Sequence, residues 1–232
     1  MKTLLIIPAY NESENIERVV NNLIQNYPQY DYIIINDCSM DSTPFLCKKN
    51  GFNYIDSPLN LGIGGCVQTG YKYAEQNNYD IAIQFDGDGQ HNPDDIKSII
   101  KPIMDNNADI VIGSRFINRE GFQSSRLRRA GIIFLGLIIY LLTGTKVKDV
   151  TSGFRAVNKR MIHFYAGNYA QDYPEPEAIV AASLLNVRIK EVPVIMQERI
   201  AGASSITLFR GAYYMLKVTL SIIILRMSIK KG

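Results

Sequence analysis

The chain has 232 residues, of which 47% are hydrophobic and 20% are charged, and its formal net charge is +3. This composition suffices for one sizeable core, and the mild charge argues against a dedicated nucleic-acid binder, in which a concentrated basic face is expected. The three cysteines follow no zinc-ligand spacing, so free thiols in a reducing cytosol are the simplest interpretation. No secretory signal opens the sequence, because the first residues lead directly into a strand-like run and a polar loop.

Short β-branched runs alternate with helical patterns over the first half of the chain. Strands are predicted at residues 4–7, 32–35, 81–83 and 109–112, and helices at residues 14–25, 65–76 and 93–104. Nearly continuous apolar strands separated by helices predict an α/β fold with a mostly parallel central sheet flanked by helices. Ligands then bind beyond the carboxyl ends of the strands, so the residues that follow each run are the candidates for chemistry.

The second half contains two longer apolar segments. Residues 130–142 are apolar throughout but fall short of the roughly 20 residues that a membrane-spanning helix needs. Residues 211–229 are interrupted by Lys217 and Arg226, so an interfacial helix is favoured over a spanning one, with burial in the core or in a dimer as the alternative. Basic residues border both segments and suit the anionic cytoplasmic leaflet of a membrane: Arg126, Arg128, Arg129, Lys230 and Lys231.

Three polar loops lie where the predicted sheet would place ligands. Residues 8–12 open a helix, whose free N–H groups suit phosphate. Asp37 follows the second run and can accept a hydrogen bond from a nucleobase N–H. The glycines of residues 60–65 permit close backbone approach to a ligand, although Val67 occupies the third glycine position of a dinucleotide fingerprint. Each loop alone is equally typical of an ordinary capped turn.

The strongest local pattern is the pair Asp86 and Asp88, which stands on a glycine-containing turn after a buried run. Two carboxylates one residue apart can face one hard cation, and oxygen ligands suit Mg²⁺ or Mn²⁺ bound to substrate phosphates. A calcium-binding EF-hand loop is excluded, because Gln90 replaces the third acid and Lys97 stands where the bidentate Glu should be. A β-turn with solvated acids is the alternative for this pattern taken alone.

These patterns, in this order, resemble the inverting family-2 glycosyltransferases with the GT-A nucleotide-sugar-binding fold. They are most similar to polyprenyl-phosphate sugar synthases of the dolichol-phosphate mannose synthase and bacterial undecaprenyl-phosphate types. Seven motifs carry the resemblance, at residues 7–12, 36–41, 62–70, 86–91, 112–116, 149–155 and 191–199. It implies a catalytic domain at residues 1–205, with an interfacial helix near 128–143, and a C-terminal amphipathic or membrane-anchoring helix at residues 206–232.

The resemblance also implies roles for individual residues. The nucleotide would be held by Pro8, Tyr10, Glu12, Asp37, Gly65 and Asp86. Asp86, Asp88 and Gln90 would hold Mg²⁺ or Mn²⁺, and Arg115, Arg129 and Arg199 would face the phosphates of donor and acceptor. Catalysis would rest on Asp88 and Arg115. Asp172, Glu175 and Glu177 would lie near the sugar pocket, with a favourable charge arrangement at a helix start as the equal alternative.

The expected function is transfer of a hexose, glucose or N-acetylglucosamine, from a UDP-sugar to undecaprenyl or another polyprenyl phosphate, with inversion, for decoration of cell-envelope polysaccharide. Because the acceptor phosphate is already ionised near neutral pH, alignment and stabilisation of the leaving diphosphate matter more than a general base. Attachment to the cytoplasmic face of the membrane would be peripheral or through a single C-terminal anchor, with a small membrane subunit or a homo-oligomer as further partners.

Two other functions stay open on the sequence. A glycosyltransferase of cell-wall or capsule synthesis would use a glycan hydroxyl as acceptor and would need a base, for which Asp172, Glu175 and Glu177 are the candidates. A non-catalytic membrane scaffold is the alternative of another class, and the intact Asp86 and Asp88 argue against it.

Overall fold

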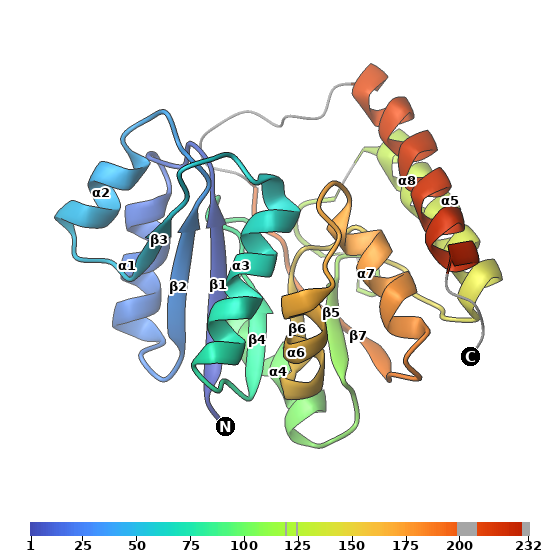
Figure 1. Cartoon of the computed structure of the whole chain (residues 1–232), viewed down its shortest axis with the longest axis horizontal. Coiled ribbons are helices and arrows are strands. Elements are labelled where there is room, and N and C mark those ends of the chain that lie inside the picture. The colour runs from blue at the N-terminus through green and yellow to red at the C-terminus, as the bar shows by residue number, and fades with distance from the viewer. Residues whose placement is uncertain (119, 124, 199–207, 229–232) are drawn as a thin grey trace.

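A seven-stranded sheet forms the centre of the computed structural model, which describes residues 1–118, 120–123, 125–198 and 208–228 (Figure 1). The strands lie in the order β3-β2-β1-β4-β6-β5-β7. Their bounds are Thr3–Ala9 (β1), Asp31–Asn36 (β2), Tyr54–Asp56 (β3), Ile81–Gln84 (β4), Ile110–Ser114 (β5), Arg155–Asn158 (β6) and Ile189–Pro193 (β7). All neighbours pair in parallel except β6, which is antiparallel to both β4 and β5.

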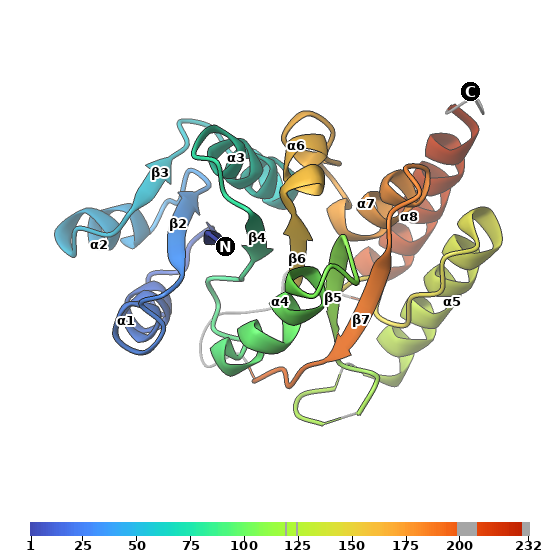
Figure 2. The same cartoon turned by 90° about the horizontal axis from the view of Figure 1, so that it is seen from below.

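Helices cover both faces of this sheet (Figure 2). One face packs against α1 (Ile16–Asn26), α2 (Thr43–Lys49) and α4 (Ile96–Met104), which follows the short 3₁₀ turn η1 (Pro93–Asp95). The other packs against α3 (Gly62–Gln76) and α6 (Lys159–Gly167), and the same apolar cluster extends to α5 (Arg126–Thr143), α7 (Pro174–Ser183) and α8 (Leu208–Ser228), which pack against one another. In α1 the buried residues Ile16, Val19, Val20 and Leu23 recur at the helical spacing that a one-sided apolar stripe requires.

The mostly parallel α/β sheet that the sequence predicts is confirmed, and so are the four predicted strands and three predicted helices, within a few residues at their ends. Three strands were not predicted. Strand β3 has only three residues, β6 has one β-branched residue in the sequence Arg-Ala-Val-Asn, and β7 carries Lys190 and Glu191. None of these segments has the apolar run that marks a buried strand in isolation.

The antiparallel strand β6 determines where the following loops lie. It places Arg155 opposite Gln84, the last residue of β4, and Ala156 opposite Ile83. Because the start of an antiparallel strand lies beside the end of its neighbour, the segment that precedes Arg155 lies over the carboxyl end of β4. The carboxylate loop, defined here as residues 86–91, begins at that same end.

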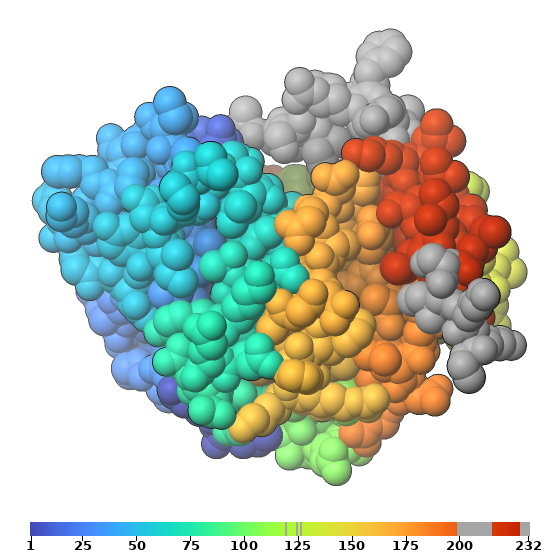
Figure 3. Space-filling model, in the orientation of Figure 1, coloured from blue at the N-terminus to red at the C-terminus, as the bar shows by residue number. Residues whose placement is uncertain are grey.

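Helix α8 forms one end of the molecule, next to α5 and α7 (Figures 1 and 3). Within the described part of the chain, no helix combines the length and the hydropathy that are needed to cross a membrane. The two charges that interrupt the apolar pattern bond to neighbouring elements: Lys217 Nζ lies 2.9 Å from Asp172 Oδ2, and Arg226 Nε donates to the Leu142 carbonyl at 3.0 Å. Residues 199–207, which include Arg199, and residues 229–232 lie outside the described residues.

Candidate active site

The loops that follow β1 and β2 are bonded to each other. The Asn11 amide donates to Ser39 Oγ at 2.9 Å, the Met40 amide donates to Asn11 Oδ1 at 2.8 Å, and the Glu12 amide donates to Thr43 Oγ1 at 2.9 Å. Asn11 and Cys38 adopt left-handed backbone conformations, with φ of 55° and 56°. Such conformations concentrate where surrounding contacts hold the backbone in place, often at ligand sites.

Of the nucleotide-binding candidates in these loops, Tyr10 is half exposed and lies at the surface. Pro8 is buried within β1, and a carboxylate oxygen of Glu12 accepts from Asn15 Nδ2 at 2.9 Å. The structure therefore brings the three residues together at the end of β1, with the Tyr10 ring as the group most open to a ligand.

Asp37 has a structural role that its sequence position did not show. Its carboxylate accepts from the Leu61 and Gly62 amides at 2.6 and 3.0 Å, so it caps the N-terminus of α3. Burial raises the pKa of the nearby Cys66 thiol, and the negative charge of Asp37 adds to this effect. Contact between Asp37 and a nucleobase stays a prediction, and it would have to use lone pairs that the helix amides leave over.

The glycines at the start of α3 are explained by packing. A Cβ added at Gly64 would lie 2.2 Å from the Ala170 carbonyl oxygen, and one at Gly65 would lie 2.6 Å from Leu61 Cβ. Both distances are too short for a real side chain. The segment at residues 170–171 thus covers the first turn of α3, and a nucleotide contact at Gly65 stays a prediction.

The carboxylate loop holds its two acids by different means. Asp88 is nearly buried, and its Oδ1 accepts from the Gln90 amide at 3.0 Å. The Asp86 amide donates to His91 Nδ1 at 2.9 Å, which leaves the His91 proton on Nε2, 3.5 Å from Asp86 Oδ2. The buried His91 ring stacks on Phe154, with 4.5 Å between the ring centroids and 13° between the planes. His91 therefore fixes the backbone at Asp86, while Gln84 Nε2 donates to Asp86 Oδ1 at 3.3 Å; sequence reasoning missed both roles.

The residues of this loop fit a hard divalent cation. Asp86 and Asp88 supply carboxylate oxygens and Gln90 an amide oxygen, the ligand type that Mg²⁺ and Mn²⁺ prefer. Among the described residues, no cluster of three or more His, Cys, Asp or Glu side chains could hold a metal alone. Water or substrate oxygens would complete the coordination, as is usual for Mg²⁺. The Gln90 Nε2 atom is turned toward the Gln197 carbonyl oxygen, 3.4 Å away, so the amide oxygen is the atom that would face a cation.

Arg115 and Arg129 both lie near Phe116, with guanidinium carbons 5.4 and 5.3 Å from its ring centroid. Arg115 is buried and forms a bidentate pair with Asp149, in which Nε and Nη2 lie 2.7 and 2.6 Å from the carboxylate oxygens. Arg115 thus holds the loop that contains Asp149, and its contact with a substrate phosphate stays a prediction. Arg129 is only partly buried, so of the two it is the more open to an anion.

The three acidic sugar-pocket candidates separate in the structure. Asp172 pairs with Lys217, and Glu177 accepts from Ser221 Oγ at 2.7 Å, so both hold α8 against α7. Glu175, at the start of α7, lies near Gln84, whose Nε2 donates to Asp86 Oδ1 at 3.3 Å. Burial raises the pKa of Glu175; the charge of Arg155 opposes this effect, while the nearby carboxylate of Asp86 adds to it. Only Glu175 therefore lies beside the carboxylate loop.

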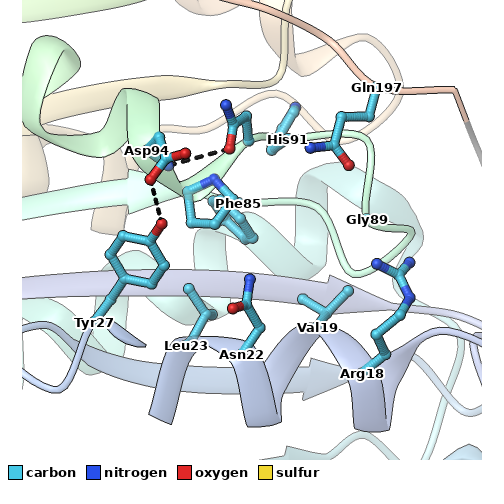
Figure 4. Close-up of a pocket in the computed structure, with 12 residues that line it drawn as sticks. Arg18, Val19, Asn22, Leu23, Tyr27, Phe85, Gly89, His91, Asp94 and Gln197 are labelled. Atoms are coloured by element: carbon cyan, nitrogen blue, oxygen red, sulfur yellow. Dashed lines mark hydrogen bonds between the residues drawn. The ribbon is translucent and has the colours of Figure 1, made fainter. Parts of the chain in front are cut away.

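A hollow of about 250 Å³ lies behind the carboxylate loop, on the side of α1 (Figure 4). Arg18 extends from α1 toward Gly89, and the Tyr27 hydroxyl bonds to Asp94 on the opposite wall. Gly89 has a φ of +78°, and a Cβ there would lie 2.3 Å from Arg18 Nη2. Helix α1 therefore supports the loop from behind, and a side chain at position 89 would displace this contact.

Gly153 provides a test of this geometry, because a Cβ there would lie 2.7 Å from Gln84 Nε2 and 3.3 Å from Asp86 Oδ2. Overpacking of this kind costs about 1–3 kcal/mol. We expect Gly153→Ala to weaken Mn²⁺ binding, measured by electron paramagnetic resonance, by about tenfold, the equivalent of roughly 1.4 kcal/mol. Gly167→Ala is the matched control, since a Cβ there would meet nothing within 4 Å. Equal Mn²⁺ affinity in the two variants would contradict the placement of Asp86.

The family model for glycosyl transferase family 2 matches residues 4–165. A curated UDP-N-acetylglucosamine–dolichyl-phosphate N-acetylglucosaminyltransferase of Methanococcus voltae is 37% identical over 210 residues, which cover 82% of this chain and 83% of the relative. An undecaprenyl-phosphate mannosyltransferase of Micrococcus luteus is 26% identical, over 89% of this chain and 88% of the relative. The resemblance to polyprenyl-phosphate sugar synthases is confirmed by these relatives.

The fold is also similar to solved structures. Glucosyl-3-phosphoglycerate synthase from Mycobacterium tuberculosis, in complex with Mn²⁺, UDP and glucosyl-3-phosphoglycerate, matches all of this chain and 81% of its own with a TM-score of 0.71. At 16% identity this likeness concerns the fold alone, and it agrees with the GT-A-like architecture predicted above. On the match to its family model, the chain belongs to glycosyl transferase family 2.

Proposed function

We propose that the protein transfers a hexose from a UDP-sugar to a polyprenyl phosphate at a membrane surface, with inversion at the sugar carbon. The observation that carries this proposal is the group of Asp86, Asp88 and Glu175 at the carboxyl end of β4, in a chain 37% identical to a dolichyl-phosphate N-acetylglucosaminyltransferase. The donor in that relative's name is a UDP-sugar, and its acceptor is a lipid phosphate.

In the proposed reaction an oxygen of the acceptor phosphate forms the bond to the anomeric carbon. The bond from that carbon to the diphosphate breaks, and its electron pair leaves with UDP. The acceptor phosphate carries negative charge near neutral pH and therefore needs no strong base. The protein's task is to align the two substrates and to stabilise the charge on the leaving group.

The described residues divide these tasks. Asp86, Asp88 and Gln90 would hold Mg²⁺ or Mn²⁺, which when bound neutralises the diphosphate as it leaves. Tyr10, at the end of β1, would contact the nucleotide. Glu175 would accept a hydrogen bond from a hydroxyl of the transferred sugar, since its carboxylate lies beside Asp86. Arg129, together with Arg199 outside the described residues, would face the acceptor phosphate.

The outer surface of α5 and α8 supports attachment to a lipid surface. Large apolar side chains are exposed along both helices: Leu127, Ile133, Phe134, Leu137, Tyr140, Leu141, Leu216, Leu220, Ile224 and Met227. The polar side chains of Lys217, Ser221 and Arg226 instead bond to neighbouring elements. A helix of a soluble monomer is apolar on the inside and polar on the outside. Both helices also bury apolar side chains, such as Leu135 and Val218, so they are apolar on two sides. The exposed apolar side, with basic residues at the start of α5, suits an anionic membrane surface.

The acceptor is tested by product partition. With purified protein, Mn²⁺, undecaprenyl phosphate and labelled UDP-sugars, we expect label to enter the organic phase. Asp88→Asn should reduce this transfer by about 100-fold or more, because the diphosphate would lose its main charge stabilisation. Label that appears only on an added glycan hydroxyl acceptor would contradict the proposal and favour Glu175 as a general base. UDP release that is unchanged in Asp88→Asn would contradict a metal-assisted transfer of either kind.

Attachment through α5 and α8 is tested by flotation with anionic phospholipid vesicles. The double variant Leu137→Gln, Leu220→Gln should bind vesicles about tenfold more weakly or worse, because each leucine contributes roughly 1.5–3 kcal/mol when fully buried. Phe45→Gln is the matched control, since Phe45 is also largely exposed but lies on α2. An equal loss of binding in both proteins, or no loss in the double variant, would contradict the assignment of this surface.

A further inference from the structure

Arg155, the first residue of β6, has a buried guanidinium group that joins two separate segments. Its Nε donates to the Ser152 carbonyl at 2.6 Å and its Nη2 to the Val150 carbonyl at 2.9 Å. Its Nη1 donates to the Glu175 carbonyl at 2.6 Å. Arginine cannot lose its charge at ordinary pH, so its burial is tolerated only with well-placed acceptors. Three donors of one rigid group thus link the loop before β6 to the first turn of α7.

Both of these segments contact the candidate active site. The loop before β6 contains Gly153, whose α-carbon faces the Gln84 amide and the Asp86 carboxylate. The first turn of α7 contains Glu175. Arg155 lies opposite Gln84 in the β4–β6 pairing, and Gln84 Nε2 donates to Asp86 Oδ1 at 3.3 Å. Arg155 therefore holds Glu175 at its carbonyl, and the Glu175 side chain lies near those of Gln84 and Asp86.

We propose that Arg155 is a positioning residue for recognition of the transferred sugar: through its bond to the Glu175 carbonyl it fixes the Glu175 carboxylate beside Asp86, where a sugar hydroxyl donates to it. This inference rests on the proposed function. A site that bonds a particular hydroxyl rejects an epimer that lacks it, because the partly buried Glu175 carboxylate is then left without that donor. Displacement of such a group by about 1 Å can cost roughly 100-fold in rate.

The donor's nucleotide and its sugar should respond differently to a change at Arg155. The nucleotide candidates lie after β1 and β2, whereas the guanidinium bonds of Arg155 reach the carbonyls of Val150, Ser152 and Glu175. A merely structural role would weaken UDP binding and sugar transfer together. A positioning role acts on the sugar alone.

Arg155→Lys is the direct test, because lysine keeps the charge but cannot present three donors in a fixed plane. With Mn²⁺ present, we expect the affinity for UDP to stay within about twofold of the wild type. The kcat/KM for the preferred sugar among UDP-glucose, UDP-N-acetylglucosamine and UDP-galactose should fall about tenfold or more, and the preference among the three should narrow. Arg160→Lys is the matched control, since Arg160 Nη2 also donates to a carbonyl, that of Leu185 at 2.8 Å, but on the surface of α6.

Glu175→Gln provides a second variant in case Arg155→Lys folds poorly. It should narrow the preference among the three UDP-sugars in the same way. In the double variant, the loss in kcat/KM should be smaller than the product of the two single-variant losses. Unchanged preference in either folded variant would overturn the inference, as would a parallel loss of UDP affinity and transfer in Arg155→Lys. A wild-type protein that transfers from none of the three donors would refute the proposed function itself, and the inference with it.

Discussion

The pairing of β6 between β4 and β5 is the constraint on which the candidate site depends. A single antiparallel strand in an otherwise parallel sheet brings the start of β6 to the end of β4, so that Arg155 lies beside Gln84. The residues that precede it, including Gly153, then lie against Asp86. The backbone hydrogen bonds between β4 and β6 thus place the loop before β6 against the Asp86 carboxylate. The side chain of Arg155, on the same strand, holds Glu175 by its carbonyl. Rigid strands hold such groups more accurately than loops alone can.

Charge is distributed unevenly around this site. Asp86, Asp88 and Glu175 contribute negative groups, whereas the guanidinium groups of Arg115 and Arg155 are buried and bonded within the protein. A donor diphosphate would add further negative charge. In the proposed reaction a divalent cation therefore has to supply the neutralisation that these arginines do not. The arginines instead hold the loops, Arg115 through Asp149 and Arg155 through three carbonyls.

The sequence predicts those features that depend on near neighbours. Apolar runs marked the parallel strands, and the spacing of Asp86 and Asp88 marked the carboxylate loop. The partners of Asp37, Asp172 and Glu177 were not predictable, because their bonds reach α3 or α8, between 24 and 45 residues away in the chain. A carboxylate that caps a helix looks the same in sequence as one that binds a nucleobase. Lys217 and Arg226 looked like interruptions of an apolar helix, and only the packing of α8 shows them bonded to its neighbours.

The central claim is that Asp86 and Asp88 form the diphosphate end of a donor site through a divalent cation. Calorimetric titration of UDP into the wild-type protein, with Mn²⁺ and then with a chelator, tests it most directly. We expect UDP to bind at least about tenfold more tightly with Mn²⁺, a difference of roughly 1.4 kcal/mol, and we expect Asp86→Asn to abolish that difference. Equal affinity for UDP with and without Mn²⁺ in the wild-type protein would contradict it.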